Sequence, residues 1–459
     1  MMYRKQILLS MVCGLGLSTT AQAVDLMGVY ELAQSHDAEI RVAEQQLNAA
    51  GENPVQARAS LLPTVTASVG QTVGSSTTTI EGTELPSEDT DTERWGVTLR
   101  QSIYDDANYG RLDRGRAQLS VAEAQYREAW QNFLFRVSER YFDVLTALDS
   151  VRFARAEETA LKRQFEQAEQ RFEVGLAAVT DVHEARAVYD AARARVITAE
   201  NAVEDARDGL REVAGAWFEN FARLAREIPL EMPDPSDAEE WVARALELNP
   251  QVLQQRSQVD VAQADLRIAR AGHLPTLGLE AGYNDFTDNE FIGRDPATQE
   301  PVGSGTLGNE GWEVGITLNV PIFSGFATQS QRNQAGFSLR AADAGLSQIE
   351  RSIKRQTETA FRAIVAGIQE VEARRQALVS ADSALEATNA GFEVGTRTIV
   401  DVLNAEQRFF QAERNYSDAR HQFILNQLRL RQSAGVLEED DLVWVNQLLT
   451  GSANSGSAN

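Results

Sequence analysis

Apolar residues recur with a seven-residue period along two long stretches of the chain. In the first stretch they are Val182, Ala185, Tyr189, Ala192, Val196, Ala199, Val203, Ala206, Leu210 and Val213. In the second they are Val402, Ala405, Phe409, Ala412, Tyr416, Ala419, Phe423 and Leu430, with a break at Asn426. This period is typical of helices that pack along one another as coiled coils. Since no proline lies between Phe326 and Ala390, one helix there could run for about 65 residues, or about 100 Å.

Shorter segments alternate apolar residues with polar or small ones, which is the pattern of strands with one apolar face. The alternation predicts four strands, at about 64–74, 94–104, 275–286 and 312–323. Each has about the 9 to 11 residues of a tilted strand that crosses a bilayer. The aromatic residues Trp95, Tyr104, Tyr283 and Trp312 lie near segment ends, as in the interfacial girdles of membrane barrels. A soluble antiparallel sheet with one buried face would show the same alternation.

The number of strands bears on that choice. An open four-stranded sheet cannot span lipid, because the amide and carbonyl groups at its edges would stay unpaired. Closure therefore requires several copies of the chain. Two, three or four copies would give 8, 12 or 16 strands, all even numbers that bacterial barrels use. The residues alone leave these three assemblies open.

The chain carries the same plan twice. Arg171–Gly175 recurs as Gly391–Gly395, 220 positions later, and each copy is followed by an Asp-Val pair at Asp181 or Asp401. We therefore expect a first repeat at 24–215 with a hairpin turn at 175–181, an intervening segment at 216–245, a second repeat at 246–435 with a hairpin turn at 395–401, a C-terminal segment at 436–450 and a disordered tail at 451–459. Gly175 and Gly395 are expected to end the long helices in the left-handed conformation.

The first 23 residues have the features of a secretory signal peptide. Arg4 and Lys5 form a positive start, 7–17 an apolar stretch, and 21–23 a small-residue cleavage site. Cleavage would remove the only cysteine, Cys13, and shift the net charge from −24 to −26. A mature chain of this kind has no disulfide or thiol chemistry, and its acidity argues against a nucleic-acid partner. No later stretch approaches the ~18 apolar residues of a membrane-spanning helix, so membrane insertion would have to use strands.

Each candidate motif for catalysis, cofactor binding or metal binding lacks either a required residue or the required structural context. The run 303–308 fits GxGxxG, but we expect it in a loop with no helix after it, so it predicts no phosphate site. His183 and Glu184 begin like a zinc-protease helix, yet Ala187 occupies the position of the second ligand. We therefore expect no enzyme activity and no cofactor.

Acidic residues crowd the two expected loops between paired strands. They are Glu81, Glu84, Glu88, Asp89, Asp91 and Glu93 in one loop, and Asp285, Asp288, Glu290, Asp295, Glu300 and Glu310 in the other, with Arg294 as a single cation. The plainer interpretation is a solvated surface loop. The functional alternative is a field that favours cations at the mouth of a pore.

Three runs carry a resemblance to a known family: Arg171–Leu176, Ala271–Leu277 and Val394–Leu403. With their spacing in two halves, the chain resembles the TolC-like outer-membrane efflux proteins over essentially its whole mature length. The resemblance implies a mixed but mainly helical fold, in which a homotrimer forms a 12-stranded outer-membrane β-barrel with four strands from each chain. The barrel would continue into a long periplasmic α-helical coiled-coil barrel, with 216–245 and 436–450 as its equatorial belt.

The same resemblance implies a location and partners. The protein would lie in the outer membrane of a Gram-negative bacterium, in contact with outer-membrane lipid, and would extend far into the periplasm. A periplasmic adaptor protein would connect it to an inner-membrane efflux pump or an ABC secretion transporter. The function implied is a passive exit duct for drug efflux, type I secretion or both, and the sequence does not select the cargo. The alternative from another class is a structural or adhesive periplasmic coiled coil without a pore.

The two hairpin turns are the candidate functional site, because in the family they form the closed periplasmic entrance. Asp401 matches an acidic position that rings the constriction. Arg397 matches an arginine that latches the mouth to the preceding hairpin, where Thr180 and Asp181 stand. A purely local interpretation also exists for Asp401, since Thr398 and Asp401 have the spacing of a capping box.

Two positions depart from the family pattern. Phe392 stands where better-known members have a tyrosine, so it cannot form a phenolic bond to Asp181. Asn404 stands one helical turn after Asp401, where a second acidic ring is often found. These departures predict a constriction with a single acidic ring and weaker block by multivalent cations than a two-ring member shows.

Overall fold

The computed structural model describes residues 23–77, 79–80, 83–84, 88–294 and 301–450. The expected signal peptide, except for its last residue, and the expected tail at 451–459 lie outside these ranges, as do Glu81, Asp295 and Glu300. The helices are α1 (Leu26–His36), α2 (Ala38–Ala59), α3 (Asp106–Glu173), α4 (Val179–Ala214), α5 (Ala238–Leu248), α6 (Pro250–Ala271), α7 (Ala327–Glu393), α8 (Ile399–Ala434) and α9 (Glu439–Gln447). None of these described helices is both long and apolar enough to cross a membrane.

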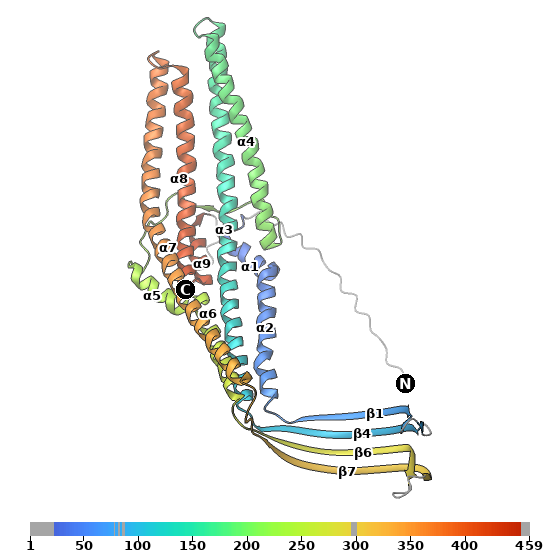
Figure 1. Cartoon of the computed structure of the whole chain (residues 1–459). Helices are drawn as coiled ribbons and strands as arrows, with labels where there is room; N and C mark the ends of the chain where they lie inside the picture. The colour runs from blue at the N-terminus through green and yellow to red at the C-terminus, as the bar shows by residue number, and fades with distance from the viewer. Residues whose placement is uncertain (1–22, 78, 81–82, 85–87, 295–300, 451–459) are drawn as a thin grey trace, which may run out of the picture. The chain divides into compact units, whose positions relative to one another are not determined.

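The long strands form one antiparallel sheet in the order β1-β4-β6-β7 (Figure 1). Their bounds are β1 (Thr64–Ser76), β4 (Glu88–Tyr104), β6 (Thr276–Arg294) and β7 (Pro301–Asn319). Two-residue strands form two further pairs, β2 (Thr79–Ile80) with β3 (Thr83–Glu84) and β5 (Arg223–Leu224) with β8 (Leu449–Thr450). The register of the large sheet aligns the apolar residues of neighbouring strands in rows. One row is Ala67, Val97, Tyr283 and Trp312, and the next is Val65, Leu99, Ala281 and Val314.

The strands differ from the expected ones mainly at one end. β4 begins at Glu88, six residues before the expected start. β6 continues beyond its expected end to Arg294, and β7 begins earlier than expected, at Pro301. The GxGxxG run at 303–308 therefore lies in a strand, and the expectation of a loop there was wrong. The expected loop residues Asp89, Asp91, Glu93, Asp285, Asp288, Glu290 and Glu310 likewise lie in strands. These extensions are held by backbone pairing between polar and glycine-rich residues, which carry no apolar alternation to signal a strand.

Contacts divide the chain into two compact units, and each unit draws on both repeats. One comprises the described residues up to Ala38, Gln131–Trp241 and the chain from Thr357 onwards. The other comprises Glu39–Trp130 and Val242–Gln356. The first unit contains α3 from Gln131 onwards, α7 from Thr357 onwards and all of α4, α8 and α9. The second contains the four-stranded sheet. The two units therefore do not follow the boundary between the repeats.

The core of the first unit contains large, fully buried aromatic residues on α1 and α3. Tyr30, Phe133, Tyr141 and Phe142 are at most 2% exposed. The Tyr141 hydroxyl donates to the carbonyl oxygen of Ala222 at 2.7 Å, which holds the segment after α4 against α3. In α4 most of the predicted apolar stripe is buried, from Ala185 to Val213, and the rest is partly exposed.

Helix α8 buries the two ends of its predicted stripe, at Val402, Ala405, Phe423 and Leu430, but a shifted set of residues in its middle. Of its predicted stripe, Phe409, Ala412, Tyr416 and Ala419 are only partly buried, whereas Leu403, Glu406, Phe410, Ser417 and Ile424 are buried. The predicted stripe on the middle of α8 is thus left partly uncovered within one chain.

Candidate functional site

The two hairpin turns have the same backbone geometry. Gly175 and Gly395 have φ values of 76° and 77°, so the expectation of left-handed glycines is confirmed. In the first turn the amide of Leu176 donates to the carbonyl of Arg171 at 2.7 Å, and that of Gly175 to Phe172 at 2.9 Å. The second turn repeats both bonds between Thr396 and Gly391 and between Gly395 and Phe392, at 2.8 and 3.1 Å. Both helices therefore end in a Schellman motif that only glycine accommodates without strain.

Asp401 caps the N-terminus of α8. Its Oδ2 accepts from the amide and the hydroxyl of Thr398, both at 2.9 Å, while its own amide donates to Thr398 Oγ1 at 3.2 Å. The hydrogen bond from the Thr398 amide is the largest cause that lowers the pKa of Asp401. The bond from the Thr398 hydroxyl and the charge of Arg397 lower it further. Asp401 is thus ionised at neutral pH. It forms a capping box with Thr398 at the start of its own helix, as the spacing of these two residues predicts.

Asp181 occupies the equivalent place in the first hairpin, with fewer partners. Its Oδ2 accepts from the amide of Ala178 at 3.3 Å. Ala178 stands at the cap position and has no side chain to return the bond. The N-terminus of α4 is therefore less completely capped than that of α8.

The remaining predicted gate residues lie at the surface of the tips. Thr180, Arg397 and Asn404 are exposed. The stem of Arg397 folds over Gly391, where an added Cβ would lie 2.8 Å from Arg397 Cγ. Within the described chain no ion pair or hydrogen bond joins Arg397 to Thr180 or Asp181. The latch stays a prediction that concerns the assembled protein.

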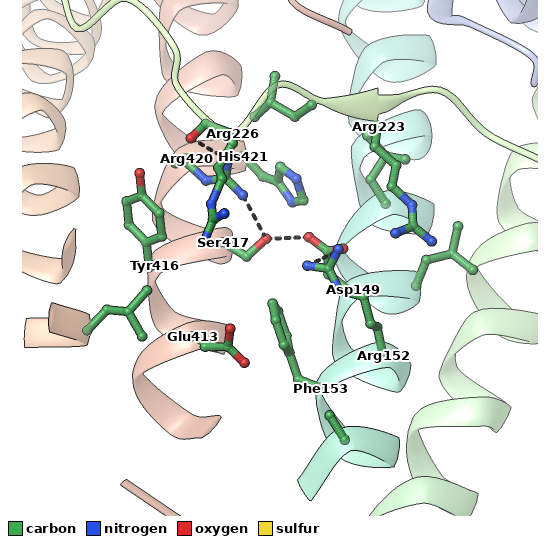
Figure 2. A pocket seen from close by; sticks show the side chains of 15 residues that line it. Asp149, Arg152, Phe153, Arg223, Arg226, Glu413, Tyr416, Ser417, Arg420 and His421 are labelled. Atoms are coloured by element: carbon green, nitrogen blue, oxygen red, sulfur yellow. Dashed lines mark hydrogen bonds and ion pairs between the residues drawn. The ribbon is translucent and has the colours of Figure 1, made fainter. Parts of the chain in front are cut away.

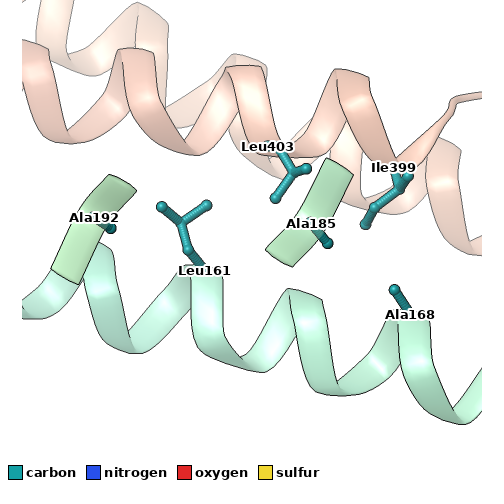
Figure 3. Close-up of a cluster of buried hydrophobic side chains, with 6 residues drawn as sticks. All are labelled: Leu161, Ala168, Ala185, Ala192, Ile399 and Leu403. Atoms are coloured by element: carbon teal, nitrogen blue, oxygen red, sulfur yellow. The ribbon is translucent and has the colours of Figure 1, made fainter. Parts of the chain in front are cut away.

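Phe392 connects the two hairpins. Its ring packs against a buried cluster made of Leu161 and Ala168 from α3, Ala185 and Ala192 from α4, and Ile399 and Leu403 from α8 (Figure 3). The guanidinium carbon of Arg171 lies 4.7 Å from the centroid of the same ring. A cation over an aromatic face is stabilising, so the phenylalanine that cannot form a phenolic bond makes a different contact with the first hairpin.

Buried polar links, which no sequence pattern indicated, also join the hairpins. Glu157 on α3, 2% exposed, binds Arg195 of α4 at 2.8 Å and Arg414 of α8 at 3.1 Å. Nearer the tips, Gln164 Nε2 donates to Glu406 Oε1 at 3.1 Å. Burial raises the pKa of Glu406. In the sequence these acids are indistinguishable from the many charges that flank coiled coils, because only the packing of α8 on α3 and α4 buries them.

The contacts between the hairpins combine a small apolar cluster with a few buried polar links. Several members of the cluster are alanines, and the connecting ion pairs can be exchanged for water when helices separate. Within the described residues, no group of three or more His, Cys, Asp or Glu side chains is arranged to hold a metal ion.

Comparison with known proteins gives consistent results. The family model for outer membrane efflux proteins matches residues 29–216 and 241–436. The chain is 35% identical to the outer membrane protein TolC of Vibrio cholerae, over 94% of this chain and 95% of that protein. It is 30% identical to the alkaline protease secretion protein AprF of Pseudomonas aeruginosa, over 94% and 88% of the two chains. The solved structure of the outer membrane protein VceC of Vibrio cholerae has the same fold, with a TM-score of 0.74 at 17% identity over 89% of this chain and 96% of that one.

Proposed function

The chain belongs to the outer membrane efflux protein family, and from this membership we propose that it forms the exit duct through which an inner-membrane pump or secretion transporter passes its cargo. It is an outer-membrane protein with a mainly helical fold and a β-barrel part. Three copies would close the barrel, and the long helices would line a passage through the periplasm. The duct itself would supply no energy.

The observation that carries this proposal is the apolar face of the four-stranded sheet. Trp312, Val314, Ile316 and Leu318 are between 62% and 78% exposed in the single chain, and Val65 and Val69 are 65% and 89% exposed. The strand register places Val65, Val314 and Trp312 in the same cross-strand rows as other apolar residues. An aligned apolar face of this kind requires a nonpolar neighbour, and lipid fits a band bordered by tryptophan and tyrosine.

The opposite face supports a water-filled lumen. Its rows include Thr66, Thr98, Gly282 and Glu313, followed by Ser68, Gly96, Asn284 and Gly311. Apolar and polar residues therefore alternate towards lipid and lumen. The sheet has β1 and β7 at its edges, so other copies must pair with both edges before it can enter lipid. Three copies would give the 12 strands that the family resemblance implies.

We further propose that the hairpin tips form the periplasmic gate. In the trimer, three Asp401 carboxylates would ring the constriction. The exposed Asn404 replaces the second ring with neutral amides. Arg397 would then pair with Thr180 and Asp181 of an adjacent hairpin. Support comes from the exposed Arg397 side chain and from the ionised state of Asp401.

The partners follow from the same reasoning. A passive duct needs a pump or ABC transporter as a source of energy and an adaptor to open the tips. AprF is by its name a protease secretion protein, and this supports export of proteins as one role. Efflux is the other role that the family description supports, and we propose drugs as its cargo.

Purification and bilayer recording test the proposal. The full chain should be extracted from outer-membrane fractions only with detergent, have the mass of a trimer, and form pores in planar bilayers. Ile316→Lys, on the apolar face, should lower the yield of assembled trimer, because a lysine at the bilayer midplane costs about 2–4 kcal/mol. Thr317→Lys, one residue away on the polar face, should assemble normally. A monomer that is stable without detergent, or trimers that form no pores, would favour the structural coiled coil instead.

A further inference from the structure

A cavity of about 460 Å³ lies in the first unit, where the segment after α4 crosses α3 and α8 (Figure 2). Its wall comes from α3, from β5 and the residues that follow it, and from α8, with Leu378 of α7 at one side. The volume is within the range of about 300–1,000 Å³ that is usual for small-molecule sites. It is remote from the hairpin tips and plays no part in the gate described above.

The charges on the wall are unbalanced. Four arginines line it, Arg152, Arg223, Arg226 and Arg420, against two carboxylates. One of these, Asp149, is already occupied, since Ser417 Oγ donates to it and Arg152 binds it at 3.2 Å. The other, Glu413, lies on α8. The wall therefore has an excess of positive charge.

His421 contributes no charge near neutral pH. It is 2% exposed, and burial lowers its pKa to about 4. Its Nδ1 lies 2.8 Å from Thr146 Oγ1. The excess positive charge of the cavity thus belongs to the arginines.

Arg420 is buried without a carboxylate. It is 7% exposed, and its Nη1 donates to the carbonyl oxygens of Ala225 and Arg226 at 2.9 and 3.1 Å. Its Nε is buried and has no hydrogen-bond partner. Among the described residues, no acidic side chain forms an ion pair with it. A buried guanidinium normally has a counter-charge of its own. The nearest carboxylate, Asp149, is connected to Arg420 only through Ser417, whose Oγ accepts from Arg420 Nη2 at 3.5 Å and donates to Asp149.

The neighbouring Arg223 and Arg226 differ from Arg420 in burial but are likewise without a carboxylate partner among the described residues. The backbone of Arg223 is fixed by pairing with β8. In the described part of the chain, the side chains of Arg223 and Arg226 form no hydrogen bond or ion pair. Both residues are exposed towards solvent. They are therefore free to turn towards a ligand in the cavity.

We propose that this cavity binds a small oxyanion, such as a phosphate or carboxylate group, held by the guanidinium groups of Arg223, Arg226 and Arg420. Arginine presents paired N–H donors that match the oxygens of such anions. A ligand here would link α8 to α3 through the segment that crosses them. It would stabilise that part of the folded chain by an amount that rises with the logarithm of its concentration above the dissociation constant. The proposal does not depend on the exit-duct function.

Calorimetric titration and thermal melting of the detergent-solubilised full chain test this site. Sodium phosphate and sodium succinate, each compared with sodium chloride at equal ionic strength, distinguish a phosphate from a carboxylate ligand. We expect heat of binding and a raised melting temperature with at least one of them. The Arg223→Gln/Arg226→Gln double variant should weaken binding by about tenfold or more. Both side chains are exposed, so the double variant should assemble as the wild type does.

Arg193→Gln is the matched control. Arg193 lies on α4, pairs with Asp190 and does not line the cavity. It should bind as the wild type does, which separates site binding from the general stabilisation that phosphate gives to folded proteins. Equal binding by the double variant and the control would overturn the proposal. An absence of binding in the wild type would also overturn the proposal. That result is expected if a carboxylate of a neighbouring copy already fills the cavity. Should the double variant not assemble, the wild-type titration decides alone.

Discussion

The two hairpins share one turn but differ in how the following helix is anchored. Both turns close on a left-handed glycine with the same pair of backbone bonds. After the second turn, Ile399 is 4% exposed, whereas its counterpart after the first turn, Val179, is 47% exposed. The cap of α8 is a threonine, and that of α4 is an alanine.

This difference shows that the repeated sequence preserves the turn and not its surroundings. The Schellman closure depends on a few adjacent residues, so it survives duplication. Burial depends on which helices surround each tip, and these differ because α8 packs against both α3 and α4. Equivalent substitutions in the two hairpins should therefore have unequal effects.

The largest inequality is expected for the paired positions Ile399 and Val179. Ile399→Ala removes a buried side chain from the cluster between the hairpins and should lower the free energy of unfolding by about 2–4 kcal/mol. Val179→Ala removes a largely exposed one and should cost less than about 1 kcal/mol. Melting temperatures of the two purified variants give the comparison. Equal losses would mean that the first tip is buried in the assembled protein.

The next effect depends on pH and concerns Glu406, whose counterpart in the first repeat is the exposed Arg186. Burial raises the pKa of Glu406 in the folded chain, so its contribution to stability is present below the unfolded pKa and is lost as the pH rises through the folded pKa. Glu406→Gln should therefore raise the melting temperature at pH 8 more than at pH 5. An amide could also donate to the unpaired Oε1 of Gln164, a gain of about 1–2 kcal/mol.

One control and one contrary outcome accompany that measurement. Arg186→Gln, at the equivalent exposed site, should show no comparable change with pH. If Glu406→Gln destabilises the protein at pH 8, the buried carboxylate is a required partner in the hairpin contact.

A smaller effect is expected from exchanging the caps. Thr398→Ala removes the hydroxyl that accepts from the Asp401 amide and should cost about 1 kcal/mol. Ala178→Thr supplies the missing hydroxyl to α4 and should stabilise by up to a similar amount. Thermal melting of the two variants and their double mutant measures both. A neutral Thr398→Ala would show that the backbone bond to Asp401 suffices.

The smallest effect is expected at the contact between Arg171 and Phe392. Arg171→Gln keeps much of the side-chain length but loses the charge over the ring, a change of about 0.5–1 kcal/mol. Its repeat counterpart is Gly391, which has no side chain. Phe392→Leu combined with Arg171→Gln in a double-mutant cycle isolates the contact. A coupling energy near zero would show that the contact between Arg171 and Phe392 does not stabilise the fold.

The sequence was most informative where structure is local. The hairpin glycines, the capping box of Thr398 and Asp401, and the apolar stripe of α4 depend on neighbouring residues and regular spacing, and all three are found. The polar ends of the strands were missed, because the extensions of β6 and β7 carry no apolar alternation. The buried Glu157 and the arginines around the cavity could not be predicted, because their surroundings come from segments more than 35 residues apart.

We propose that Asp401, and not its counterpart Asp181, forms the acidic ring at the periplasmic constriction. Planar-bilayer conductance with a trivalent cation on the periplasmic side tests it most directly. We predict that the cation blocks the wild type, that Asp401→Asn abolishes the block while Asp181→Asn retains it, and that Asn404→Asp strengthens it by adding a second ring. A pore of Asp401→Asn that is blocked like the wild type would contradict the claim.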